Sequence, residues 1–317
     1  MKQEPFRKKY VKTAGHRAGG RSGYMKLVTF QNQGGAEKIG VLSASGNSVI
    51  PAEETGVFYE SMQELIGKGS REEFSALAKA ALEKKGLPLE TIRILAPIPH
   101  PSQDIICLGI NYMDHAEESA RFKKEEFNGE RPYAVYFSKR VINAVADGEP
   151  IDGHFDIVDS LDYEAELAVI IGKEAYHVAP EDAVEYVFGY TVLNDVSART
   201  IQMRHKQWYF GKSLDGFTPM GPWLVTRDEV AWPPKLGIWS RVNGELRQES
   251  NTSLLIFDIP FVISELSQGM TLLPGTIISM GTPAGVGMGF EPPRFLSGGD
   301  VVECGIEGIG VLTNPVK

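Results

Sequence analysis

Two acidic residues, Glu164 and Glu166, stand at the start of the apolar stretch LDYEAELAVIIGK (161–173). Because side chains alternate across a strand, the two carboxylates share one face and lie about 6–7 Å apart along it. Either burial raises their pKa values, or a cation keeps both of them ionised. The alternative is that both face solvent on a half-exposed strand, since alternating polar residues are common there.

A third acidic residue favours the interpretation in which a cation keeps Glu164 and Glu166 ionised. Asp195 ends the predicted strand VFGYTVLND (187–195) and precedes a helix-like segment (196–205). Three carboxylates at strand ends predict a hard, all-oxygen metal site, which suits Mg²⁺ or Mn²⁺, with Ca²⁺ as a further possibility. Cysteine and histidine do not stand at zinc-ligand spacing beside these acids.

A histidine with a carboxylate partner follows another predicted strand. His115 and Glu118 are three residues apart in CLGINYMDHAEES, so a helix there brings them together, with Asn111 as its expected N-cap. An imidazole oriented by a carboxylate is a workable general base. The alternative is a solvated pair on a surface helix. The highly charged segment that follows (118–130) is interpreted as a lid that carries the base.

Two further stretches combine glycine with polar side chains. SMGTPAGVGMGF (279–290) is not a dinucleotide-binding loop, because EPPRF follows it where a helix should begin. Its glycines favour a close approach of backbone N–H groups and Thr282 to an anionic group, or they form a simple loop between strands. In FGKSLDGFTPMGP (210–222), Lys212 is either a group that stabilises substrate charge near the metal or a snorkelling surface lysine.

Composition narrows the class of protein. The chain has 317 residues, 42% hydrophobic and 23% charged, with a net charge of −9, which argues against nucleic acid as a partner. Apolar runs fall short of the ~20 residues that a membrane span needs. Two distant cysteines, Cys107 and Cys304, indicate neither a disulfide framework nor a metal site and fit a reducing cytoplasm.

Three segments are predicted along the chain. Residues 1–24 hold seven Lys/Arg and one Glu, and we expect an added leader or an over-extended start, with a transit peptide or a flexible tail as alternatives. Residues 25–95 predict a small α+β domain, in which a helix from residue 71 ends near Gly86. Residues 96–317 begin with a proline-rich connector and continue with many short strands, which predicts a closed or folded-over sheet rather than a doubly wound one. The fold class is therefore α+β, mostly β.

Taken in order, the motifs GINYMDHAEES, LDYEAELAVIIGK, GYTVLNDVSART, FGKSLDGFTPMGP, LLPGTIISMGTPAGVG and GDVVECGIEGIGVLTNPV resemble the fumarylacetoacetate hydrolase family over residues 95–317. The resemblance implies a distorted mixed β-barrel or β-roll, usually as a homodimer. It implies a divalent metal, Mg²⁺ or Mn²⁺, on Glu164, Glu166 and Asp195, and a His115–Glu118 pair on a lid. It also implies that Arg199, Gln202, Lys212 and Thr282 contact a small 2-oxo acid substrate.

The resemblance leaves the reaction open. Members cleave C–C bonds in acylpyruvates and diketo acids, decarboxylate oxaloacetate, or isomerise and decarboxylate hydroxymuconate-type diacids. Our hypothesis is C–C bond hydrolysis through a metal-bound enolate, with His115 activating water while Lys212 and Gln202 stabilise charge. A silent metal-binding scaffold is the non-enzymatic alternative. The sequence departs from its relatives at Arg140, where proline often follows a lysine like Lys139; Arg140 either faces the pocket and favours a second substrate carboxylate, or points outward.

Overall fold

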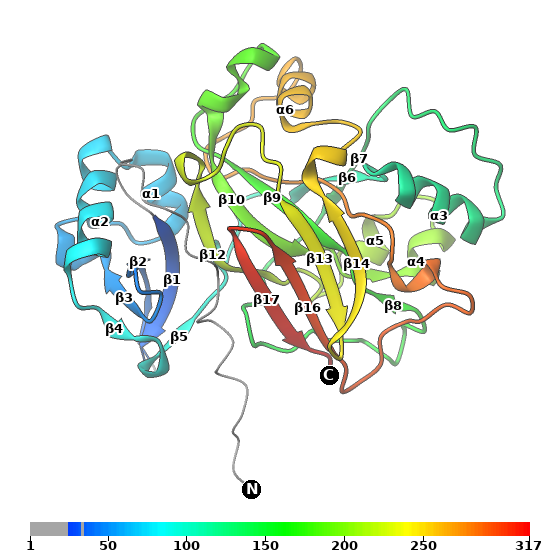
Figure 1. Cartoon of the computed structure of the whole chain (residues 1–317), viewed down its shortest axis with the longest axis horizontal. Coiled ribbons are helices and arrows are strands. Elements are labelled where there is room, and N and C mark those ends of the chain that lie inside the picture. Colours follow the sequence, from blue (N-terminus) through cyan, green and yellow to red (C-terminus); the bar gives the residue numbers. More distant parts are fainter. Residues whose placement is uncertain (1–24, 33–34) are drawn as a thin grey trace, which may run out of the picture.

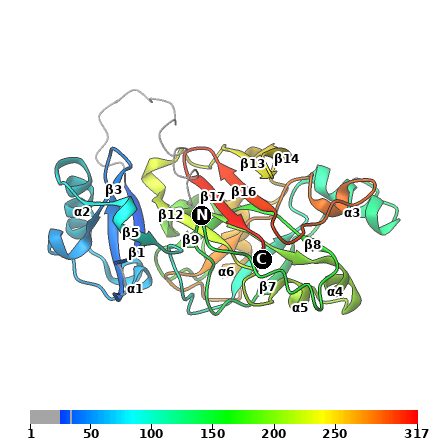
Figure 2. The same cartoon turned by 90° about the horizontal axis from the view of Figure 1, so that it is seen from below.

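The computed structural model describes residues 25–32 and 35–317 and has a mostly-sheet α+β fold, as the sequence predicts (Figure 1). The expected leader, residues 1–24, lies outside the described residues. Figures 1 and 2 both place α1 and α2 at one end of the long axis and α3 at the opposite end, with the strands between them.

One large sheet holds eleven strands in the order β4-β3-β2-β1-β12-β10-β9-β15-β6-β7, with β5 paired to β1. Its strands are β1 (Lys26–Asn32), β2 (Glu37–Leu42), β3 (Ser48–Pro51), β4 (Leu87–Pro88), β5 (Ile92–Ile94), β6 (Ile105–Gly109), β7 (Val135–Lys139), β9 (Ala165–Ile171), β10 (Val187–Asn194), β12 (Met220–Thr226) and β15 (Ile277–Ser279).

The remaining strands form two smaller sheets. One has four strands in the order β14-β13-β16-β17, namely β13 (Gly237–Val242), β14 (Glu245–Asn251), β16 (Val301–Ile306) and β17 (Gly310–Pro315). The other pairs β8 (Leu161–Asp162) with β11 (Ser197–Ala198). Among the described residues, no ring of hydrogen-bonded strands closes, so the barrel that the resemblance implies is not closed.

The α-helices are short and lie outside the sheets. They are α1 (Met62–Lys68), α2 (Arg71–Glu83), α3 (Met113–Lys123), α4 (Arg199–Arg204), α5 (Tyr209–Lys212) and α6 (Ile259–Ser267). Pro260 stands in the first turn of α6, where its missing N–H costs no helical hydrogen bond. In the described part of the chain, none of these helices has the length and apolar character to cross a bilayer.

The N-terminal unit shares the large sheet with the rest of the chain. Strand β1 pairs antiparallel with β12 through Lys26↔Val225 and Leu27↔Leu224. Backbone hydrogen bonds therefore run across the expected boundary at residues 95 and 96, and the division into a small domain (25–95) and a catalytic domain (96–317) stays a prediction.

Strand β9 is buried on both faces, which explains its near-continuous apolar sequence. Leu167, Val169 and Ile171 belong to one core cluster, whereas Ala168 and Ile170 belong to another. Antiparallel pairing with β10 sets Ala165 opposite Asn194 and Glu166 opposite Leu193. The end of β10 therefore meets the start of β9, which brings Asp195 beside Glu164.

Two predicted boundaries are wrong. Helix α2 ends at Glu83 with Lys84 as C-cap, and Gly86 instead passes so close to Val49 that a Cβ atom would collide with its backbone. The stretch LGIWSRVNGEL (236–246), whose apolar and alternating residues predict a single strand, forms a hairpin instead, because Asn243 and Gly244 both adopt positive φ (53° and 82°) between β13 and β14.

Candidate active site

Glu164, Glu166 and Asp195 form a buried carboxylate cluster. One carboxylate oxygen from each lies within 4.8 Å of the others, and all three residues are buried. Glu164 lies just before β9, Glu166 within it, and Asp195 just after β10. The Asp195 N–H donates to the Glu164 carbonyl oxygen (2.9 Å), so the pairing of the two strands fixes the cluster. The solvent-facing alternative for the two glutamates is excluded.

Three buried cations surround this cluster. Lys212 Nζ lies 2.6 Å from Glu164 Oε2 and 2.7 Å from Asp195 Oδ2, while Lys139 Nζ lies 2.8 Å from Asp195 Oδ1. Arg199 donates to Glu164 Oε1 (2.6 Å) and to Asp162 Oδ2 (2.8 Å). Lys212 is therefore no surface lysine: it bridges two of the three clustered acids.

Glu166 is the acid of the cluster that forms no ion pair with a lysine or arginine of the described residues. Its Oε2 accepts from the Ser279 hydroxyl (2.5 Å) and the Gly281 N–H (2.9 Å), so Oε1 accepts neither bond. Burial, together with the charges of Asp195 and Glu164, raises the pKa of Glu166 well above its usual value. A divalent cation would remove this repulsion, and the oxygen donors are those that such a cation prefers, so the residues fit a metal.

The pKa of Glu164 is shifted in the opposite direction to that of Glu166. Burial alone would raise its pKa, but the charges of Lys212 and Arg199 outweigh burial and lower the pKa below the usual value. Burial would likewise lower the pKa of Lys212, yet the carboxylates of Asp195 and Glu164 raise it. Both groups are thus held in their charged forms.

His115 and Glu118 form a buried pair on α3. His115 Nδ1 lies 2.9 Å from Glu118 Oε2, and both side chains are buried, which excludes the solvated alternative. The helix begins after Tyr112, not after Asn111. The Asn111 side chain instead donates to the carbonyl oxygens of Phe257 (2.9 Å) and Met280 (2.8 Å) and thereby ties the start of α3 to other segments.

The glycine-rich stretch contacts the chain's own carboxylates. Gly285 N–H donates to Glu118 Oε1 (2.9 Å), and the N–H groups of Gly287 and Met288 donate to Asp162 (2.6 and 3.0 Å). A Cβ atom on Gly289 would collide with the Glu118 carboxylate. Backbone N–H groups of this stretch thus approach anionic side chains of the chain itself, whereas Thr282 contacts neutral groups, and the loop holds Glu118 against His115.

One cavity of about 40 Å³ joins the His–Glu pair to the carboxylate cluster. Its walls include seven of the nine predicted residues: His115, Glu164, Glu166, Arg199, Gln202, Lys212 and Thr282. Glu118 and Asp195 are not in the walls but bind residues that are. Thr282 Oγ1 donates to the Ala165 carbonyl oxygen (2.9 Å), and Gln202 Oε1 accepts from Arg199 (3.2 Å).

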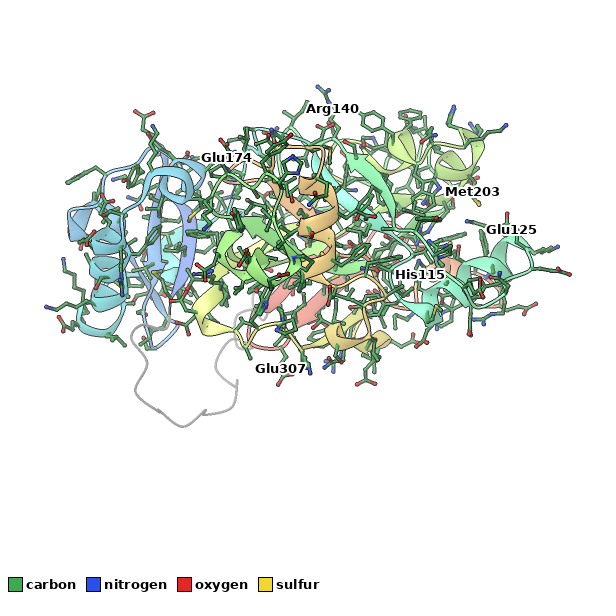
Figure 3. The ribbon with its side chains drawn as sticks, turned by 90° about the horizontal axis from the view of Figure 1, so that it is seen from above. His115, Glu125, Arg140, Glu174, Met203 and Glu307 are labelled. Carbon is green, nitrogen blue, oxygen red and sulfur yellow. The ribbon has the colours of Figure 1, made fainter. Side chains whose placement is uncertain are left out.

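Arg140 lies apart from this cavity. It is exposed and lines a separate hollow of about 160 Å³ with Ile142 and Asp215. Figure 3 shows Arg140 at the edge of the molecule, away from His115 and Met203. The outward-facing alternative therefore holds, and Arg140 does not act on a substrate in the main cavity.

Sequence reasoning missed three residues of this site. Asp162 extends the alternation of Glu164 and Glu166 backwards by two residues, a signal that could have identified it. Lys139 ends an apolar strand, where its full burial has no signal in the sequence. Gln248 comes from the remote strand β14 and donates to Thr282 Oγ1 (2.7 Å) and the Pro283 carbonyl oxygen (2.7 Å).

Comparison with known proteins gives the family. Residues 104–317 match the family described as fumarylacetoacetate (FAA) hydrolase, C-terminal. The chain belongs to the fumarylacetoacetate hydrolase family. Within that family it is 47% identical over 228 residues to oxaloacetate tautomerase YisK of Bacillus subtilis, covering 72% of this chain and 74% of the relative. It is 40% identical over 304 residues to the mitochondrial oxaloacetate tautomerase fahd2 of Xenopus laevis, covering 92% and 90%.

Solved structures of the fumarylacetoacetate hydrolase family share the fold. A fumarylacetoacetate hydrolase from Exiguobacterium antarcticum superimposes with a TM-score of 0.76 at 39% identity, covering 92% of this chain and 99% of that one. A maleylpyruvate hydrolase from Sphingobium sp. SYK-6, in complex with manganese(II) and pyruvate, gives a TM-score of 0.73 at 31% identity, covering 92% and 98%. The chain is thus an enzyme of a family that includes tautomerases, isomerases and hydrolases.

Proposed function

We propose that this protein is a divalent-metal-dependent enzyme that interconverts the enol and keto forms of a small 2-oxo dicarboxylic acid, with oxaloacetate as its substrate. The observation that carries the proposal is the shared cavity: His115, oriented by Glu118, lines the same small space as Glu164 and Glu166. Two relatives at 40% identity or more are named oxaloacetate tautomerases, which supports this substrate.

The carboxylate cluster of Glu164, Glu166 and Asp195 would hold the cation. All three ligands are hard oxygens, which favours Mg²⁺ or Mn²⁺. When bound, the cation supplies Lewis acidity that polarises the 2-oxo group. The ammonium groups of Lys139 and Lys212 neutralise part of the negative charge of the three carboxylates. A single divalent ion can therefore neutralise the negative charge that remains.

The proton transfer falls to the His–Glu pair. Glu118 receives the Nδ1–H of His115, so Nε2 is the ring nitrogen left to exchange a proton with substrate carbon C3. In the direction from keto to enol form, neutral Nε2 takes a proton from C3 and water protonates the enolate oxygen. In the reverse direction, water takes the enol O–H proton and the imidazolium of His115 returns the Nε2 proton to C3, so His115 regains its neutral form. The Gly285 N–H on Glu118 keeps the pair oriented during this exchange.

Three further polar groups would bind the substrate. Arg199 and Gln202 lie on one turn of α4 and line the cavity, where they offer N–H donors to the C1 carboxylate. Lys212 also lines the cavity and would stabilise negative charge on the enol oxygen. Thr282, held by Gln248, completes the wall and would donate a hydroxyl hydrogen bond.

Hydrolysis of a C–C bond in an acylpyruvate is the second candidate. The maleylpyruvate hydrolase with bound manganese and pyruvate favours it, because it shares the fold. In that reaction His115 Nε2 would take a proton from water rather than exchange one with C3.

The two reactions are separated by their products. We expect the Mg²⁺- or Mn²⁺-loaded protein to accelerate the loss of enol-oxaloacetate absorbance, without a matching release of pyruvate, and EDTA to abolish the acceleration. Stoichiometric pyruvate release from acetylpyruvate would instead establish hydrolysis. Absence of metal-dependent turnover with any 2-oxo acid would contradict both and leave a metal-binding scaffold.

A further inference from the structure

One face of α3 lines the cavity over two helical turns. His115, Ser119 and Lys123 stand four residues apart and all three belong to the cavity wall. Residues at this spacing lie above one another on a helix. The face that presents the proposed base near the carboxylate cluster therefore also presents a lysine farther along the same cavity.

Lys123 lies farther along the cavity wall than His115. Eight residues of helix separate the two, a rise of about 12 Å. Long helical side chains lean toward the N-terminus, so both side chains lean the same way along α3. The ammonium therefore stands beyond the imidazole on the same wall, where it can meet the end of a bound acid that is remote from the carboxylate cluster.

Lys123 differs from the other cations of the cavity wall. Arg199 and Lys212 are already bound to carboxylates of the chain. In the described part of the chain, Lys123 forms no ion pair; its ammonium lies 5.9 Å from the centre of the Trp208 ring. Lys123 therefore offers an incoming anion an ammonium group that no carboxylate of the described residues neutralises.

An apolar wall stands around this lysine. Trp208 packs edge-on against Phe137, with ring centres 5.3 Å apart, and both line the cavity. Trp208 also lies so close to Gly109 that a Cβ atom there would collide with its ring. Such surroundings lower the local dielectric and strengthen the attraction between an ammonium and a carboxylate.

We propose that Lys123 is a specificity-determining residue that binds the distal carboxylate of the substrate. It makes the site selective for 2-oxo dicarboxylic acids over 2-oxo monocarboxylic acids. This inference rests on the proposed function, because the 2-oxo end of the substrate is taken to lie at the carboxylate cluster. A lysine on α3 would also link binding of the distal carboxylate to the position of His115 on the same helix.

The test compares two substrates that differ only at the distal group. Oxaloacetate carries a carboxylate where 2-oxobutyrate carries a methyl group, and C3 proton exchange in D₂O is followed by NMR for both. We expect Lys123→Met to lower kcat/KM for oxaloacetate by about tenfold or more, the effect of one lost charged hydrogen bond, and to leave 2-oxobutyrate nearly unchanged. Lys123→Arg should restore most of the selectivity.

Lys124→Met is the matched control, because Lys124 is exposed and does not line the cavity. Equal losses on both substrates, or an unchanged rate for oxaloacetate, would overturn the role of Lys123. If the wild-type protein exchanges protons in neither substrate, the proposed function fails, and calorimetry still tests the inference. In that case Lys123→Met should weaken binding of oxaloacetate relative to oxalate, and an unchanged ratio would overturn it.

Discussion

At the scale of single residues, the candidate site contains more buried acid than buried base. Asp162, Glu164 and Asp195 contact three cations, Lys139, Arg199 and Lys212. The unmatched acid is Glu166, whose raised pKa follows from burial and from its acidic neighbours. The cluster therefore offers a divalent cation a buried carboxylate that no ammonium or guanidinium group of the described residues neutralises.

Substitution of His115 tests whether this residue is the general base or a ligand of the metal. We expect His115→Ala to lower kcat by about 10²-fold or more, because the general base is lost, while metal content stays unchanged. His100→Ala is the control, since His100 is exposed and pairs with Glu37 at the surface. Metal content is measured by atomic emission; loss of metal on His115→Ala would show that His115 is a ligand.

Substitution of Lys139 tests whether its ammonium group is needed to neutralise the buried carboxylate of Asp195. The residue is fully buried, and its ammonium contacts Asp195 Oδ1 and the carbonyl oxygens of Val196 and Lys212. In metal-free protein we expect Lys139→Met to reduce the free energy of unfolding by about 3 kcal/mol or more, because a buried carboxylate loses its partner. Saturating Mg²⁺ should recover part of the loss.

Urea denaturation with and without Mg²⁺ measures this effect. Lys38→Met is the control, because its partly exposed pair with Glu53 contributes about 0–1 kcal/mol. A loss no greater than that of the control would contradict the role of Lys139 in the charge balance.

At the scale of elements, the site depends on contacts between segments far apart in the sequence. Glu164 and Asp195 meet through the register of β9 and β10, and Glu118 meets Gly285 through the packing of α3 on the glycine-rich loop. Alternation and helical spacing predicted the paired acids and the His–Glu pair from sequence, because both are local. Burial of Lys139 and the role of Gln248 are not local and could not be predicted.

The same distinction explains the errors in the elements. Gly86 looked like a helix C-cap, but its small size serves a close approach to Val49, a contact set by tertiary packing. Asn111 looked like an N-cap, but its amide binds Phe257 and Met280 instead. The Asn243–Gly244 turn carried a hairpin signal that the strand-like residues around it obscured.

Gly289 tests how the loop supports α3. We expect Gly289→Ala to lower kcat by about tenfold or more, because the added methyl group displaces the Glu118 carboxylate from His115. Gly269→Ala is the control, since a Cβ atom there has open space around it. Wild-type activity in Gly289→Ala, measured with metal saturating, would show that the loop does not hold the pair.

Strand β9 should respond to the metal. Without a cation the acids at its start repel one another, so we expect EDTA to speed amide hydrogen exchange at residues 164–167 more than in β16. Exchange followed by mass spectrometry with and without Mg²⁺ measures the difference. Equal exchange rates at residues 164–167 with and without Mg²⁺ would show that metal binding does not stabilise the start of β9.

At the scale of the whole molecule, one sheet connects the N-terminal unit to the strands of the site through β1 and β12. Helix α3 lies at the far end of the molecule from α1 and α2 (Figures 1 and 2), so the N-terminal unit does not reach the cavity. Residues of the site come from β7, β8, β9, β14, the end of β10, α3, α4, α5 and the loop between β15 and β16, and only the complete fold assembles them.

We also predict that the protein is a homodimer. The family resemblance carries this expectation, and closed two-fold dimers are the commonest oligomers of soluble enzymes. Light scattering after gel filtration should give twice the mass of the chain. A monomer mass at micromolar concentration would contradict the prediction without affecting the site, which lies within one chain.

The central claim is that His115 moves a proton at C3 of a 2-oxo acid held beside the carboxylate cluster. Its most direct test is the rate of deuterium entry at C3 of oxaloacetate in D₂O, compared between metal-loaded wild type, EDTA-treated wild type and metal-loaded His115→Ala. We predict fast exchange in the first and only the spontaneous rate in the other two. Fast exchange in His115→Ala, or without metal, would contradict the account.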